Sequence, residues 1–137
     1  MRIEDIHVGD VAELAKTVTE SDIVLFAGVT GDFNPVHIDA EAAKQSVFGE
    51  RIAHGMLSAG FISAVLGMRL PGSGSIYLSQ TLRFTKPVRI GDTVTARVEV
   101  VEVMSAKRRV RLATSCRNQN GEVVVDGEAV VMLENRE

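Results

Sequence analysis

The chain lacks several features on which whole classes of protein depend. It has one cysteine, Cys116, so no disulfide can form within it, and a reducing compartment is expected. It has no tryptophan and only 4% aromatic residues, so its core must be built mainly from aliphatic side chains and Met. Its three prolines and the absence of low-complexity sequence mark no linker, and we expect one domain over residues 1–137.

An excess of positive charge and long apolar runs are also missing. The 15 Lys and Arg residues face 18 Asp and Glu residues, and the net charge of −3 argues against a nucleic-acid partner. No apolar run approaches the roughly 20 residues that span a bilayer, so no membrane partner is expected. The acidic start of the chain is unlike a secretory signal. We therefore expect a cytoplasmic protein.

The period of hydrophobicity is close to 3.6 residues in the first half of the chain and close to 2 in the second half. The first half predicts, in order, a strand over residues 11–17, a helix from Thr19 or Ser21 to near Gly28, a loop from Thr30 to His37, and a short helix capped by Asp39. The longest predicted helix covers His54 to Leu70. It is apolar on nearly every side, which is typical of a buried helix.

The second half predicts four antiparallel strands. Turn signals at Gly91-Asp92 and Asn120-Gly121 separate alternating apolar runs, and Asp126-Gly127 is a candidate bulge in the last run. The fold class is therefore α+β, with an antiparallel sheet wrapped around one long central helix. So small a sheet leaves edge strands and apolar surface that a homodimer would cover.

The densest polar cluster lies between Gly31 and His37. Asp32 and His37 are close enough, across a loop stiffened by Pro35, to share one small ligand such as a water molecule. A carboxylate and an imidazole on one water can remove a proton and return one, which is general acid–base chemistry. The same residue types also form purely structural turns, so spacing alone leaves both interpretations open.

Gly55 opens the long predicted helix. Unpaired N–H groups and the positive end of the helix dipole lie at this position, so the Gly55 amide could hold a carbonyl oxygen or an anion. The glycine could equally ease a tight turn into the helix. His7, His37 and His54 lack the spacing and the Cys or carboxylate neighbours of a zinc site, and we predict no metal.

These motifs together resemble a known family. Residues 30–39 read TGDFNPVHID, and residues 51–57 read RIAHGML. Both segments closely resemble the R-specific enoyl-CoA hydratases, which are MaoC-like dehydratases, and the similarity covers nearly the whole chain. The resemblance implies a hot-dog fold, a homodimer and an acyl-CoA thioester substrate. It also places the family's catalytic Asp and His on Asp32 and His37, and its oxyanion-hole glycine on Gly55.

The implied reaction is the reversible hydration of a trans-2-enoyl-CoA to an (R)-3-hydroxyacyl-CoA. Asp32 is expected to be the base, and His37 is expected to orient the water and help to deliver a proton to Cα. Gly55 and Asn34 are the predicted substrate-binding residues, Asn34 by bracing the loop. No cofactor is expected, because coenzyme A arrives with the substrate. Three alternatives remain: a dehydratase of carrier-protein thioesters, a thioesterase, and a non-catalytic acyl-CoA-binding module.

Overall fold

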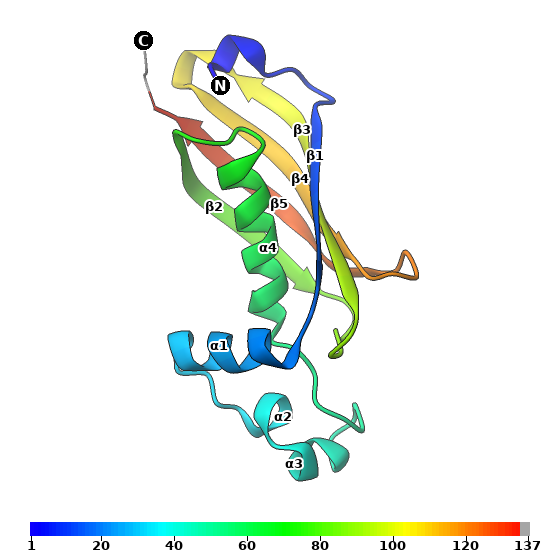
Figure 1. Ribbon diagram of the computed structural model, residues 1–137. Helices are drawn as coiled ribbons and strands as arrows, with labels where there is room; N and C mark the ends of the chain where they lie inside the picture. The colour runs from blue at the N-terminus through cyan, green and yellow to red at the C-terminus, as the bar shows by residue number, and fades with distance from the viewer. Residues whose placement is uncertain (135–137) are drawn as a thin grey trace.

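A computed structural model describes residues 1–134 of the chain (Figure 1). Five strands form one antiparallel sheet in the order β1-β3-β4-β5-β2, which confirms the α+β class. The strands are β1 (Val11–Thr17), β2 (Ser75–Phe84), β3 (Thr93–Met104), β4 (Arg109–Arg117) and β5 (Val123–Leu133). The α-helices are α1 (Glu20–Thr30), α2 (Pro35–Ile38), α3 (Ala40–Lys44) and α4 (Gly55–Met68), and short 3₁₀ helices cover Ile3–Asp5 and Ser105–Lys107.

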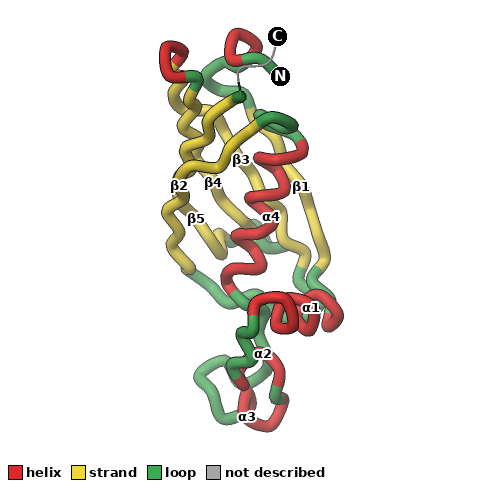
Figure 2. Tube along the Cα trace, turned by 90° about the vertical axis from the view of Figure 1, so that its left-hand side faces the viewer, coloured by secondary structure: helices red, strands yellow, loops and turns green. Residues whose placement is uncertain are grey.

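The sheet curves around α4, and the small helices α1 to α3 lie at the N-terminal end of α4 (Figures 1 and 2). The helix buries Ile62, Val65 and Leu66 against the strands. Its opposite face, with Met56 and Gly67, is exposed. The expected burial of this helix is therefore confirmed for one face only, because five strands enclose only part of its circumference.

Local capping fixes the ends of the first helices. Thr19 caps α1, since its hydroxyl accepts a hydrogen bond from the Asp22 amide at 3.2 Å and the Asp22 carboxylate accepts one from the Thr19 amide at 2.9 Å. The helix continues past Gly28 and ends at Thr30, followed by Gly31 in the left-handed region with φ 81°. The helix therefore ends two positions after the expected end near Gly28, because a glycine inside a helix costs only about 1 kcal/mol and does not stop it.

The segment between Thr30 and His37, expected to be a loop, is partly helical. The short helix α2 occupies its second half, with Pro35 at its first position and the Asn34 side chain accepting from the Val36 amide at 3.3 Å. Proline suits this position because its missing N–H would have no partner in the first turn. Asp39 caps α3 as expected, through hydrogen bonds from the amides of Glu41 and Ala42.

The strands follow the predicted alternation, but the bulge expected at Asp126-Gly127 is absent from β5 within the described residues. Asp126 and Gly127 pair in regular register with β4. A Cβ at position 127 would lie 1.8 Å from the Thr81 carbonyl oxygen, so this glycine allows β2 and β5 to approach closely. The register shifts lie elsewhere, between Tyr77 and Ser79, Val100 and Glu102, and Cys116 and Arg117.

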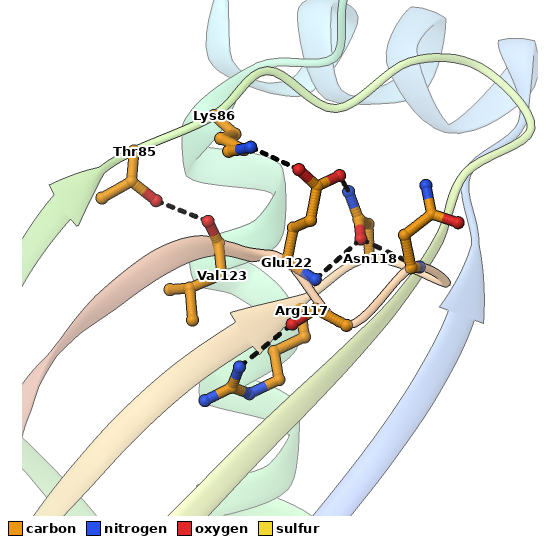
Figure 3. Close-up of polar contacts among 8 residues, drawn as sticks. Thr85, Lys86, Arg117, Asn118, Glu122 and Val123 are labelled. Carbon is orange, nitrogen blue, oxygen red and sulfur yellow. Dashed lines mark hydrogen bonds and ion pairs between the residues drawn. The ribbon is translucent and has the colours of Figure 1, made fainter.

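The segment after β2 is fastened to the turn between β4 and β5 (Figure 3). The Thr85 hydroxyl donates to the Val123 carbonyl at 2.6 Å, and Lys86 forms an ion pair with Glu122. The side-chain amide of Asn118 also donates to the Glu122 carboxylate, at 3.0 Å. The hydrogen bonds from Lys86 and then from Asn118 lower the pKa of the Glu122 carboxyl. These contacts fix the direction in which the chain leaves Phe84.

Among the helices of residues 1–134, none is both long enough and apolar enough to cross a bilayer. The expectation of one domain over residues 1–137 stays a prediction, and residues 135–137 lie outside the described part of the chain.

Cys116 provides a test of the packing between β4 and α4. Its thiol is completely buried and donates to the Ser58 carbonyl at 3.4 Å, and burial raises the pKa of the thiol from 9.0 to about 12. Only the thiolate reacts with disulfide reagents, so we expect negligible labelling of the folded protein at pH 8 and full labelling in denaturing urea. Rapid stoichiometric labelling of the folded protein would contradict this packing.

Candidate active site

Asp32 lies in an exposed turn directly after α1. Gly31 reverses the chain, and the Asp32 amide then donates to the Thr30 hydroxyl at 3.2 Å. The Asp32 carboxylate accepts one hydrogen bond, from the Asn34 amide at 3.2 Å. Within residues 1–134 it has no other partner, so most of its acceptor capacity faces solvent. A carboxylate of this kind can accept hydrogen bonds from a small ligand.

The imidazole of His37 on α2 has a fixed orientation. Its Nδ1 lies 2.8 Å from the Ile52 carbonyl oxygen, and a carbonyl can only accept, so Nδ1 carries the proton and donates. In the neutral ring Nε2 therefore presents a lone pair. The backbone of His37 is held as well. The Arg51 guanidinium donates to the His37 carbonyl at 2.8 Å and to the Glu20 carboxylate at 2.6 Å. His37 is buried, and its acceptor nitrogen is held in one direction.

His54, which precedes α4, brings the two segments together. Its ring stacks on that of His37 with centroids 3.9 Å apart, and its Nε2 lies 3.0 Å from the Asp32 carbonyl oxygen. One potential ligand atom from each of Asp32, His37 and His54 lies within 4.8 Å of the others. The expected meeting of Asp32 and His37 is therefore observed, with a second histidine beside them.

The first turn of α4 has no side-chain cap. His54 is the N-cap residue, and its side chain makes no capping hydrogen bond. The amides at the start of a helix have no partner within the helix, and they carry the positive end of its dipole. Gly55 also has no room for a side chain, because a Cβ there would lie 2.6 Å from Cδ1 of Phe84. The glycine therefore allows the Phe84 ring to pack directly against the first turn of α4.

These groups open onto a pocket of about 400 Å³ between the start of α4 and the segment after β2. His37, His54, Gly55, Phe84 and Lys86 are among the residues that line it, and the area that they and their neighbours present is mostly apolar. Asp32 and Asn34 are not part of the lining. Asp32 lies beside the two histidines at the exposed side, and Asn34 braces the turn by accepting from the Val36 amide.

The grouping of Asp32, His37 and His54 raises the question of a metal ion. The sequence argument that these histidines lack a carboxylate neighbour was wrong, because the fold supplies Asp32. A metal ion lies in the plane of each imidazole that binds it, at about 2.0–2.1 Å from the nitrogen for zinc. The two rings are stacked with only 28° between their planes, so an ion in the plane of one lies off the plane of the other. The donor set does not fit a metal in this arrangement, and the absence of a metal stays a prediction.

Sequence reasoning missed the contributions of His54 and Phe84. His54 contacts residues 17 to 28 positions earlier in the chain, and Phe84 lies on a glycine 29 positions earlier, so neither contact is visible as local spacing. One signal was available. A histidine at the N-cap of a long helix is unusual, since Ser, Thr, Asp and Asn are favoured there.

Comparison with known proteins identifies the family. A MaoC like domain matches residues 7–122. The (R)-specific enoyl-CoA hydratase of Rhodospirillum rubrum is 57% identical over 97% of this chain and 92% of its own length. The 3-hydroxybutyryl-CoA dehydratase of Methylorubrum extorquens is 52% identical over 98% of this chain and 85% of its own length. The chain belongs to the MaoC-like family, and the resemblance seen in its motifs is confirmed.

A solved structure supports the same assignment. The unliganded R-hydratase of Pseudomonas aeruginosa superposes with a TM-score of 0.93 at 50% identity, over 98% of this chain and 86% of that one. The expected hot-dog fold, a sheet wrapped around one central helix, is thereby confirmed.

The contact between Gly55 and Phe84 can be tested by stability measurements. In Gly55→Ala the new methyl group overlaps the Phe84 ring, and we expect the free energy of unfolding in urea to fall by about 1–3 kcal/mol. Gly67→Ala is the matched control on the same helix, because no atom lies within 4 Å of its Cβ position. It should be neutral or stabilising by up to about 1 kcal/mol. In a Phe84→Ala background the cost of Gly55→Ala should largely disappear, and an unchanged cost would contradict the contact.

Proposed function

We propose that the protein catalyses the reversible hydration of trans-2-enoyl-CoA to (R)-3-hydroxyacyl-CoA. One observation carries the proposal: two proton acceptors, Asp32 and His37, lie within a few ångströms of each other beside the uncapped first turn of α4. Addition of water to an α,β-unsaturated thioester needs this combination. A base must activate the water, and a donor must stabilise the negative charge on the carbonyl oxygen.

In the proposed mechanism a water molecule donates its two hydrogens to the Asp32 carboxylate and to Nε2 of His37. Asp32 takes one proton as the water oxygen attacks Cβ, and the Cβ–O bond forms while the carbon–carbon double bond becomes an enolate. The proton that Asp32 took is then returned to Cα, and His37 orients the water and helps this transfer. The fixed donation from Nδ1 of His37 to Ile52 supports this role, because it leaves Nε2 as the acceptor. The residues end the cycle in the protonation state in which they began it.

The Gly55 amide is proposed to hold the thioester carbonyl. Its hydrogen bond makes Cβ more electrophilic and strengthens as charge develops on the oxygen, so it favours the transition state over the bound substrate. Asn34 is proposed to brace the turn that carries Asp32, as its hydrogen bond with the Val36 amide allows. Both the hydroxyl group and the added hydrogen come from water, so the proposed reaction needs no redox group.

A direct test of the proposed function is hydration of crotonyl-CoA by the purified protein. We expect loss of the absorbance of the conjugated double bond, and a product that is oxidised only by an R-specific 3-hydroxyacyl-CoA dehydrogenase. Oxidation only by the S-specific dehydrogenase would reject the stereochemical assignment. Release of free thiol from saturated acyl-CoA would indicate a thioesterase, and a strong kinetic preference for carrier-protein thioesters would indicate the dehydratase alternative.

Asp32→Asn tests the proposed base. The amide keeps an oxygen that can accept from the Asn34 backbone, so the turn should persist while the proton acceptor is lost. We expect kcat to fall by roughly 10²–10⁴-fold, the usual contribution of a positioned general base, with an unchanged circular dichroism spectrum. The control is Asp10→Asn, whose side chain accepts from the His7 amide in the turn before β1 and should leave activity intact. Turnover near the wild-type value in Asp32→Asn would refute the mechanism.

We further propose that two chains form a homodimer across β2. This strand is an edge of the sheet, and it exposes Ile76, Tyr77 and Leu78 together. A groove of about 540 Å³ beside it, lined by residues of β2 and of the exposed face of α4, is also open. An apolar edge strand of this kind favours pairing with another strand. A second copy of the chain would cover both the edge and the groove.

Light scattering tests the dimer. We expect a mass of twice the 14.8 kDa of one chain at micromolar concentrations, because the exposed apolar surface is continuous with an unpaired edge. A mass near 14.8 kDa throughout this range would contradict the proposal.

A further inference from the structure

His54 is almost completely buried, although the mechanism proposed above gives it no role. Its exposed fraction is 2%, and its ring contacts two other aromatic rings. The centroid of the Phe26 ring lies 4.6 Å from that of His54, and the centroid of the His37 ring lies 3.9 Å from it. Packing alone explains an aromatic residue in this place. It does not explain an imidazole, which carries two polar nitrogens into a dry environment.

The two nitrogens of His54 have different surroundings. Nε2 lies 3.0 Å from the Asp32 carbonyl oxygen, which can only accept, so Nε2 carries a proton and donates. Nδ1 is buried and has no hydrogen-bond partner within residues 1–134. A second proton on Nδ1 would have no acceptor, so the ring fits this site as the neutral Nε2–H form.

His37 has the opposite arrangement. Its Nδ1 donates to the Ile52 carbonyl, so its neutral form is the Nδ1–H tautomer. The two stacked rings therefore connect different parts of the backbone: His54 ties the start of α4 to the turn after α1, and His37 ties α2 to the segment before α4. Each backbone carbonyl selects one tautomer.

The hydrogen bond from His54 is of particular value for Asp32. Every other hydrogen bond in the turn 31–34, within the described residues, joins groups no more than four positions apart. The bond from His54 spans 22 positions and is the one that anchors the turn to the body of the protein. Without it, the carboxylate is free to shift relative to the His37 ring and the first turn of α4.

We propose that His54 is a positioning residue, held in the neutral Nε2–H tautomer, that fixes the Asp32 turn against His37 and the start of α4. The expected effect on the rate rests on the proposed function, whereas the tautomer of His54 does not. A displacement of a reacting group by about 1 Å can cost up to roughly 100-fold in rate. The effect of losing His54 should therefore fall on kcat rather than on KM.

Nitrogen NMR of protein labelled with ¹⁵N-histidine tests the tautomers. The chain has three histidines, so His7→Gln identifies the signals of the exposed ring, His54→Gln identifies those of His54, and the remaining signals belong to His37. We expect His54 as Nε2–H and His37 as Nδ1–H at pH 8. An Nδ1–H or doubly protonated His54 would overturn the proposal whether or not the protein hydrates enoyl-CoA. Stoichiometric binding of zinc that shifts both His54 nitrogens would overturn it too.

Two substitutions test the positioning role. His54→Phe keeps a ring beside Phe26 and His37 but removes the donor, and we expect kcat to fall by about 10–100-fold with KM changed less than about threefold. His54→Gln keeps a donor near the position of Nε2 and should recover much of the lost kcat. His7→Gln should leave kcat unchanged. Wild-type kcat in His54→Phe, or no recovery in His54→Gln with its fold intact, would refute the role, whereas an inactive wild-type protein would refute the proposed function instead.

Discussion

The burial of one face of α4 in the curved sheet is the constraint on which the rest of the structure depends. Ile62 and Val65 are fully buried, and each such side chain contributes about 1.5–3 kcal/mol by leaving water. This packing fixes the axis of the helix and hence the place where its first turn emerges. The uncapped amides, the Phe84 ring against Gly55, and the two stacked histidines are all arranged around that turn.

Backbone groups do most of the positioning at this end of the helix. The carbonyls of Ile52 and Asp32 orient the two imidazoles, and the Asn34 amide holds the Asp32 carboxylate. Backbone atoms move less than long side chains, so a site assembled in this way loses little conformational entropy when it binds a substrate. The segment after β2 is held by the Thr85 and Lys86 contacts, which gives the opposite wall of the pocket a similar rigidity.

The elements that sequence predicts well are those whose signals are local. Alternation marked the strands, and the caps at Thr19 and Asp39 marked the starts of two helices, because each depends on residues within a few positions. The prediction of a bulge at Asp126-Gly127 was wrong for a non-local reason, since Gly127 allows β2 to approach β5 closely. Asp32, His37 and Gly55 were identified from compact motifs. His54 and Phe84 were not, because their contacts exist only once α4 has packed.

The proposed mechanism requires that one water, held by Asp32 and His37 together, supplies both the hydroxyl group and the proton. Hydration of crotonyl-CoA in heavy water, followed by NMR analysis of the relative configuration at Cα and Cβ, tests this claim directly. Groups on one short segment reach one face of the substrate, so the account predicts syn addition and a single diastereomer. Anti addition, or a mixture of the two diastereomers at early times, would contradict it.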